Sequence, residues 1–415
     1  MLMRIMLAAA VGLVPVATPV PAMAAAPPPV PGQTAPFREI PLQTAPTKAE
    51  PEPDCQQVLQ QARRMALASG KTATVPCVTL SSPDAAVVAP DAVGVQEFCG
   101  VNEWAFTRHT ACISGVSGVL SVYALVEGRE VLVGQVYFTI TTGTSTSGNS
   151  ARWTHSFSLT PTLMWGSVGN TYLIATAECA ANCNFESMNF NSAFPIATGV
   201  SRSGSATLST TSYGEGTVWR AWSTWAYWFR NPDWVIPVSN TLRISAPDHR
   251  CDEAIGIRFS IGCVYSQVRP LHEIGRTRYP KYARHIELAI NFGVPSILTR
   301  TQISAQNAAN RARACPQSPA NGWSCDEYPF ASTQEGAANP IHPYGRTFQI
   351  LNWNNGAEPF FCGIGWLTPR RAGDSLGYSV CGIPLDQNTG GGTDLGNFYI
   401  RNRVLHDDRF QVMVV

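Results

Sequence analysis

Beyond its first 26 residues, the chain lacks any run of about 18 consecutive apolar residues, the length that a membrane-spanning helix requires. Residues 1–26 begin with Arg4 in a positively charged start, continue as an apolar run and end in the small residues of 22–26. This order, with its A-x-A-like end, is typical of a cleaved signal peptide. We therefore expect the mature protein to be secreted, without a membrane span.

Charged residues are also scarce, at 14% of the 415 positions, and the formal net charge is only +1. A net charge this close to zero indicates neither an anionic nor a cationic partner. Residues 241–415 contain 17 Lys and Arg against 14 Asp and Glu, and 16 of these 17 cations are arginines. Arginine binds phosphate bidentately. Phosphate recognition and a general compositional bias explain this enrichment equally well.

A zinc site is not indicated, because Cys179-x-x-x-Cys183 has no second Cys or His pair at ligand spacing beside it. The twelve cysteines all follow the signal segment, and their even number favours disulfides formed in an oxidising compartment. Sequence alone does not determine how they pair. We expect near neighbours to pair, as Cys55 with Cys77, Cys99 with Cys112, Cys179 with Cys183, Cys251 with Cys263, Cys315 with Cys325, and Cys362 with Cys381.

Three segments are expected between the signal peptide and residue 245. Residues 27–54 are rich in proline and predict an extended spacer. Residues 55–95 contain one short helix, predicted over Cys55 to Ser69, with Gly70 as its stop. Residues 96–244 consist of short β-branched and alternating runs separated by turn residues, which predicts an all-β, sandwich-like domain of unknown role.

Five tryptophans lie close together near the end of the β-rich segment. An aromatic run at this spacing fits a groove that stacks sugars or single-stranded bases. It also fits a hydrophobic core, and we favour the core, because a strand would direct neighbouring rings to both of its faces. The five are Trp219, Trp222, Trp225, Trp228 and Trp234.

Residues 245–415 predict a separate α+β domain. A cysteine-closed hairpin is expected at 249–265, followed by an amphipathic helix from Tyr279 to Ile290 with Pro280 in its first turn. A second helix is expected from Ile303 to Ala314, and a short third helix from Gly392 to Asn402. The stretch from Asn339 to Ser379 reads as a loop insertion.

Two motifs in this domain carry candidate chemistry. The first is CDEYPFAST at 325–333, which places Asp326 beside Glu327 on a strand that ends at a proline. The second extends from Pro384 through Asn388 and 391–399 to Leu405. Together the motifs resemble the NucA/NucB-type secreted deoxyribonucleases, over about residues 245–415. The resemblance implies a ββα-metal core similar to that of the His-Me finger nucleases, in which a hairpin presents the base and a following helix presents a metal ligand.

Roles for individual residues follow from that resemblance. Asp326 matches the position of the general base, and Asn388 that of the metal-binding Asn. Glu327 is expected to ligate the metal or to orient the catalytic groups, and Glu335 to make an outer metal contact. The expected metal is Mg²⁺ or Mn²⁺, since both prefer oxygen ligands. Further candidates are Gln387 and Arg403 as substrate contacts, His285 as a structural or catalytic histidine, and His342 as an alternative base.

The predicted function is that of a secreted, metal-dependent, sequence-nonspecific endonuclease that acts on DNA, with RNA cleavage left open. We expect a monomer. Two other functions remain at this stage: a cell-surface or glycan-binding adhesive protein with a degenerate nuclease module, and an antibacterial nuclease toxin. No family is indicated by residues 27–240, so the role of the β-rich domain and its partner stay unassigned.

Overall fold

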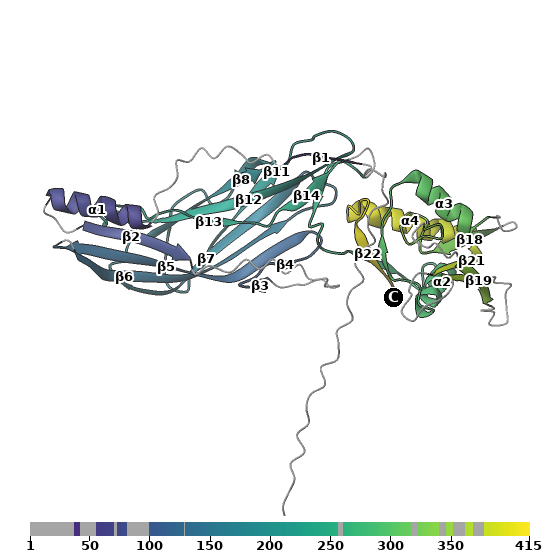
Figure 1. The fold of residues 1–415 in the computed structure, drawn as a ribbon. Coiled ribbons are helices and arrows are strands. Elements are labelled where there is room, and N and C mark those ends of the chain that lie inside the picture. Colours follow the sequence, from purple (N-terminus) through teal and green to yellow (C-terminus); the bar gives the residue numbers. More distant parts are fainter. Residues whose placement is uncertain are drawn as a thin grey trace, which may run out of the picture. The chain divides into compact units, whose positions relative to one another are not determined.

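The computed structural model describes most of the chain from residue 37 onward, and it is rich in β-strands with few helices (Figure 1). None of the described helices is long and apolar enough to cross a membrane. The predicted signal peptide and most of the proline-rich spacer lie outside the described residues. The described ranges are 37–41, 55–69, 73–80, 99–127, 129–255, 260–316, 322–339, 346–351, 362–367 and 377–415.

One sheet of the β-rich part follows the order β2-β5-β6-β7-β11-β9, with β3 and β4 paired to β5. Its three longest strands form an antiparallel meander, because each is joined to the next by a short connection. The helix α1 (Cys55–Ser69) has the predicted bounds and packs on β2. The strands are β2 (Ala73–Leu80), β3 (Gly100–Val101), β4 (Ala105–Phe106), β5 (Thr110–Val126), β6 (Arg129–Ser145), β7 (Arg152–Gly166), β9 (Asn184–Met188) and β11 (Arg202–Ser209).

A second sheet follows the order β10-β8-β12-β14-β15, with β1 and β13 also paired to β12. The long strand β12 therefore has neighbours from widely separated parts of the sequence. These strands are β1 (Arg38–Glu39), β8 (Tyr172–Ala181), β10 (Phe194–Pro195), β12 (Thr217–Arg230), β13 (Leu242–Ser245), β14 (His249–Asp252) and β15 (Gly262–Val264).

Side chains from both sheets form one hydrophobic core. The tryptophans of β12 contribute to it as the core interpretation predicts: Trp219 and Trp225 are buried, and Trp234 packs against the same cluster. Trp222 and Trp228 are half-buried, so successive rings do alternate in burial along the strand. The groove interpretation is wrong for the buried rings, because they have no surface to offer a ligand.

The cysteine-closed hairpin forms as predicted, with Cys251 opposite Cys263 in the register of β14 and β15. Its place differs from the expectation, however. Strand β14 pairs with β12, and both cysteines belong to the core of the β-rich part. Placing the start of the α+β segment at 245 was therefore wrong for this hairpin, because its backbone hydrogen bonds continue the preceding sheet.

The described residues of the remaining part form two small sheets and three helices. One sheet has the order β16-β22-β17 and the other β18-β21-β20-β19. The strands are β16 (Leu271–Ile274), β17 (Ile297–Thr299), β18 (Trp323–Tyr328), β19 (Arg346–Leu351), β20 (Cys362–Leu367), β21 (Tyr378–Pro384) and β22 (Arg409–Val414). The helices are α2 (Pro280–Asn291), α3 (Ser304–Ala314) and α4 (Leu385–Arg401).

Helices α2 and α3 lie where the sequence predicts them, and α2 begins at Pro280 with one face buried. Helix α4 begins seven residues before the predicted Gly392. Glycines disfavour helix interiors, which hides its start in the sequence. Packing explains two of them, since a Cβ at Gly390 or Gly391 would meet the rings of Tyr279 and Tyr282 at 2.4–2.8 Å.

The predicted loop insertion at 339–379 contains two strands, β19 and β20, that extend the sheet of β18 and β21. The insertion is therefore partly regular structure. His342 lies outside the described residues. The sandwich-like arrangement and the ββα-metal core stay predictions.

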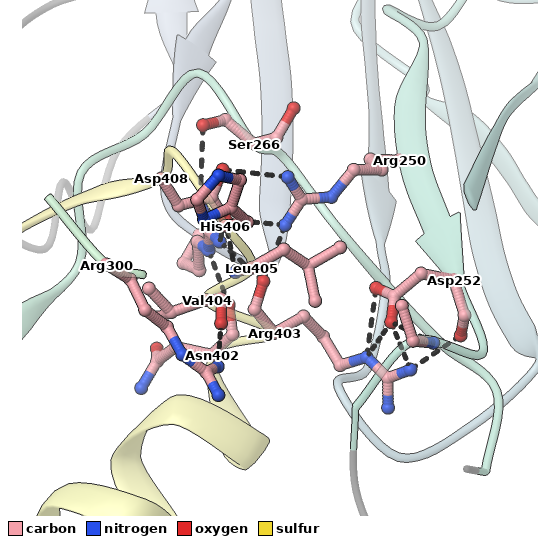
Figure 2. Close-up of polar contacts among 12 residues, drawn as sticks. Arg250, Asp252, Ser266, Arg300, Asn402, Arg403, Val404, Leu405, His406 and Asp408 are labelled. Carbon is pink, nitrogen blue, oxygen red and sulfur yellow. Dashed lines mark hydrogen bonds and ion pairs between the residues drawn. The ribbon is translucent and has the colours of Figure 1, made fainter. Parts of the chain in front are cut away.

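Helix α4 ends in a Schellman motif, in which the N–H of Val404 donates to the carbonyl of Tyr399 and the N–H of Arg403 to that of Ile400. Arg403 occupies the left-handed position of the motif, with φ of 46°. Glycine usually occupies this position, because other residues are strained there. The strain is offset by the side chain of Arg403, which is fully buried and paired with the carboxylate of Asp252 at 2.5 Å (Figure 2).

The predicted role of Arg403 as a phosphate contact is therefore wrong. Its guanidinium has no exposed surface, and besides Asp252 it donates to the carbonyls of Gly148 and Ser260. Since a substrate phosphate cannot reach it, Arg403 instead anchors the end of α4 to the loop after β14.

A second buried ion cluster lies a few residues further along the chain. The carboxylate of Asp408 accepts a hydrogen bond from Arg250 at 2.6 Å (Figure 2). It also accepts one from Arg108 at 3.1 Å. Burial raises the pKa of Asp408, but the two arginines outweigh this effect and hold it below its usual value. The segment 402–408 is thus fixed by charges contributed from β14 and from the turn before β5.

Five of the six predicted disulfides are present in the described residues. Cys381 is also disulfide-bonded, and the backbone of Cys362 lies opposite it in the register of β20 and β21. Among the described cysteines none is free. The bonds are Cys55–Cys77, Cys99–Cys112, Cys179–Cys183, Cys251–Cys263 and Cys315–Cys325.

We predict that Arg403→Met lowers the free energy of unfolding by about 3–5 kcal/mol, because it leaves the carboxylate of Asp252 buried without its partner. Equilibrium unfolding in urea measures the change. Arg220→Gln is the matched control, since it removes an ion pair to Asp248 whose side chains are 50% and 45% exposed. It should cost less than about 1 kcal/mol. Equal costs for the two variants would contradict the anchoring role of Arg403.

Candidate active site

A cavity of about 500 Å³ opens between β18, α3 and α4. Its wall includes Asp326 and Glu327 from the first sequence motif and Asn388 from the second. The two motifs are separated by about sixty residues in the sequence, and the structure brings them to one place. The other lining residues used below are Tyr282, Arg311, Ser324, Cys325, Ala331, Gly392 and Gly396.

Strand β18 lies at the end of its sheet, with β21 as its only partner among the described strands. It ends at Tyr328, because the next residue is a proline and has no N–H for the ladder. Asp326 and Glu327 are neighbours on the strand and so face opposite sides. The carboxylate of Asp326 contacts His285 on α2. The carboxylate of Glu327 interacts electrostatically with Arg311 on α3.

Asp326 is buried, with 4% of its surface exposed, and its Oδ2 lies 2.6 Å from Nδ1 of His285. The other ring nitrogen of His285 lies 2.9 Å from the hydroxyl of Ser379. The Nδ1–H of His285 can thus donate to the carboxylate, while Nε2 contacts the serine hydroxyl. Burial raises the pKa of Asp326, and His285 opposes this rise. Ser379 is itself fully buried, so it has no access to a substrate.

The carboxylate of Glu327 has a raised pKa of about 7. Burial is the main cause, and the neighbouring charge of Asp326 adds to it. Arg311 and the backbone N–H groups of Glu327 and Ala331 oppose the rise. Near neutral pH this carboxylate therefore changes easily between its protonated and ionised forms.

Asn388 lies in the first turn of α4, next to the open edge of β18. Its amide nitrogen donates to the hydroxyl of Ser324 at 2.8 Å and to the carbonyl of Cys325 at 3.0 Å. Both donor hydrogens are used, which aims the side chain and leaves Oδ1 as an acceptor at the wall of the cavity. These two bonds hold Asn388 against the strand that carries the two carboxylates.

Two other predicted residues lie outside this wall. The carboxylate of Glu335 accepts the backbone N–H of Thr299 at 2.9 Å, so it ties the loop after β18 to β17. The side-chain carbonyl of Gln387 accepts the N–H of Lys281 at 2.7 Å, at the start of α2. The described contacts of both side chains are therefore within the protein, which differs from the expected metal and substrate contacts.

Sequence reasoning missed one wall residue and did not predict the contact of His285 with Asp326. Arg311 was not singled out, because α3 carries no motif and its arginines look like a solvated helix face. His285 was treated as more often structural than catalytic. Its position on the buried face of α2, three residues from Tyr282, was the available signal, since a buried histidine needs polar partners.

A second cluster of possible metal ligands within the described residues consists of His249, Cys251 and Cys263. The two cysteines form a disulfide and therefore offer no thiolates. Burial lowers the pKa of His249 to about 3. This cluster is part of the core of the β-rich part and fits no zinc site.

Two carboxylates and an amide thus line one cavity, and a comparison with known families covers the segment that holds the two carboxylates. Residues 286–358 match the family model of deoxyribonuclease NucA/NucB. The C-terminal part of the chain thus contains a NucA/NucB-type domain, as its motifs predicted. The match includes Asp326 and Glu327 and ends before Asn388. No curated protein matches the chain.

The raised pKa of Glu327 predicts a pH-dependent stability of the NucA/NucB-type domain. Since the folded state holds the proton more tightly, the contribution of Glu327 is favourable below pH 4.5 and is lost as the pH rises to about 7. Glu327→Gln should therefore raise the free energy of unfolding at pH 8 by up to ~3 kcal/mol, with little change at pH 4. Urea unfolding at both pH values in a chelator measures this difference.

Glu287→Gln is the control for this experiment, because its carboxylate lies on the exposed face of α2 beside Arg276. It should give no such gain at pH 8. The same pH dependence in the Glu327→Gln variant and in the wild type would show that Glu327 is not the titrating group.

Proposed function

We propose that this protein is a secreted endonuclease that hydrolyses phosphodiester bonds of DNA without sequence specificity and uses Mg²⁺ or Mn²⁺. The observation that carries the proposal is the meeting of Asp326, Glu327 and Asn388 at one cavity. The NucA/NucB match over the segment that holds the two carboxylates supports the choice of reaction. It also supports DNA as the substrate, while the residues alone specify only a phosphodiester.

The residues at the cavity fit a hard divalent cation. Asn388 offers Oδ1, which has no hydrogen-bond partner among the described residues, and Glu327 offers a carboxylate in the lining of the same cavity. Magnesium and manganese prefer such oxygen donors. When bound, the cation would neutralise negative charge on the scissile phosphate and on the departing 3′-oxygen. We assign Asn388 and Glu327 as its ligands.

Asp326 is the general base in this proposal. It would take a proton from the water molecule that attacks phosphorus, while the bond from phosphorus to the 3′-oxygen breaks. A raised pKa suits this role, because a more basic carboxylate accepts the proton more readily. His285 would hold the carboxylate in place through its Nδ1–H and so leave the second carboxylate oxygen for the water.

An extracellular location agrees with the five described disulfides, which persist in oxidising compartments. The segment predicted as a signal peptide would direct the export. The family match gives no support to the adhesive or the toxin alternative.

Asp326→Asn should lower the rate of plasmid cleavage by at least about 100-fold, because it removes the proton acceptor and keeps the shape of the side chain. Supercoiled DNA with Mg²⁺ or Mn²⁺ is the substrate, and urea unfolding checks that the variant is folded. Asp386→Asn, an exposed carboxylate in the first turn of α4, is the control and should cleave normally. Near-normal cleavage by Asp326→Asn would remove Asp326 from its role.

Asn388→Ala should raise the Mn²⁺ concentration that gives half-maximal cleavage by about 10-fold or more, since it removes a ligand. The titration is made at saturating DNA, so that substrate affinity does not affect it. Asn397→Ala, an exposed position on the same helix, should leave the titration unchanged. An unchanged titration in Asn388→Ala itself would overturn the ligand assignment.

A further inference from the structure

Helix α3 forms the wall of the cavity that faces Glu327, and its Arg311 lines that wall with an exposed side chain. Among the described residues, none forms a hydrogen bond or an ion pair with its guanidinium. By contrast, the guanidiniums of Arg108, Arg250 and Arg403 are buried, and each is paired with a carboxylate within the protein. The guanidinium of Arg311 is thus available to a ligand in the cavity, as far as the described residues are concerned.

The position of Arg311 is fixed by its neighbour. Asn310 is fully buried, and its amide nitrogen donates to the carbonyls of Ala331 at 2.8 Å and Thr333 at 2.9 Å. Its Oδ1 accepts the N–H of Ala338 at 3.0 Å. These three bonds tie α3 to the loop that follows the strand of Asp326 and Glu327. The next residue on the helix, Arg311, is therefore held over the cavity on a rigid element.

Helix α4 lines the cavity with two glycines among its larger side chains. Gly392 and Gly396 are one turn apart on α4 and both line the cavity. A Cβ added at either position would meet nothing within 4 Å, unlike one at Gly390 or Gly391. Glycine in a helix costs stability, and packing within the described residues gives no reason for it at these two positions. The room that they leave lies on the cavity side of the helix.

We propose that Arg311 binds a backbone phosphate of the nucleic acid, and that Gly392 and Gly396 leave the space in which this backbone lies. Arginine suits the role because its fork pairs with two oxygens of one phosphate. The cavity then holds the substrate beside a cation on α3 and the two glycines of α4, with the carboxylates in the same wall. This inference rests on the proposed nuclease function and names the residues that position its substrate.

A purely internal role for Arg311 is the alternative that the experiment has to separate, because its charge also acts on Glu327. Binding is therefore measured in the double variant Asp326→Asn, Glu327→Gln, in a chelator. Cleavage is then absent, and Glu327 carries no charge for Arg311 to balance. Fluorescence anisotropy of a short, 5′-fluorescein-labelled DNA duplex gives the Kd at a series of salt concentrations.

Adding Arg311→Gln should weaken duplex binding by about 10-fold and lower the slope of log Kd against log salt by about 0.9, the value for one lost phosphate contact on duplex DNA. Arg311→Lys should keep the slope and recover part of the affinity. Arg313→Gln, on the same helix but away from the cavity wall, is the matched control and should change binding much less. An unchanged Kd and slope in Arg311→Gln would overturn the proposal.

The glycine face has its own test. Gly396→Leu, in the same background, should weaken binding by about 10-fold or more without lowering stability in urea, since the new side chain enters open space. Thr393→Leu, on the exposed side of α4, should leave binding unchanged. Normal binding by Gly396→Leu would show that the backbone does not lie there.

The nuclease function and the phosphate contact of Arg311 are contradicted by different results. In one outcome, the wild type cleaves DNA and the double variant binds the duplex, while the added Arg311→Gln leaves binding unchanged. In that case only the proposed phosphate contact of Arg311 is wrong. If the double variant does not bind the duplex at any salt concentration, the phosphate contact of Arg311 is also wrong, whether or not the wild type cleaves DNA. If the folded wild type fails to cleave with either metal, the nuclease function is wrong.

Discussion

The buried ion pairs around residues 402–408 are the constraint on which the arrangement of the C-terminal part depends. Arg403 is held in a left-handed conformation at the end of α4, and its guanidinium is satisfied by Asp252 and by backbone carbonyls (Figure 2). Charges are costly to bury, so such a pair is stable only where every polar atom has a partner. Since β14 supplies Asp252 and Arg250, the end of α4 is fixed relative to the sheet of β12.

From that anchor, the site follows in a few steps. Helix α4 leads back from Arg403 to Asn388, whose amide is held against the open edge of β18. The same strand presents Asp326 to His285 on α2, and Asn310 ties α3 to the loop that follows it. Each candidate group is therefore held by a hydrogen bond from a neighbouring element. A reaction that relies on placing charge beside a phosphate needs this kind of preorganisation.

Much of this architecture is readable from the sequence where local rules dominate. Helix α1 has the predicted bounds, and the near-neighbour pairing holds for all five described disulfides. The NucA/NucB resemblance was readable because Asp326, Glu327 and Asn388 lie in contiguous motifs. Strong periodicity and close spacing leave a local signal that tertiary structure does not override.

The errors arise where long-range pairing decides. The strand of His249–Asp252 was assigned to the following domain, because only its hydrogen bonds to β12 show which sheet it extends. The start of α4 was missed, since its glycines read as a loop until Tyr279 and Tyr282 are seen to pack on them. Arg403 looked like a phosphate ligand for a similar reason, as its partner Asp252 lies about 150 residues earlier in the chain.

The central claim is that one cavity holds both the divalent cation and the DNA backbone. A crystal structure of the Asp326→Asn variant with Mn²⁺ and a short DNA duplex tests it most directly, because anomalous scattering locates the manganese independently of the protein. The account predicts manganese at about 2.0–2.3 Å from Oδ1 of Asn388, beside the carboxylate of Glu327, with a phosphate at the same cavity. Manganese bound elsewhere, or DNA that avoids this cavity, would contradict it.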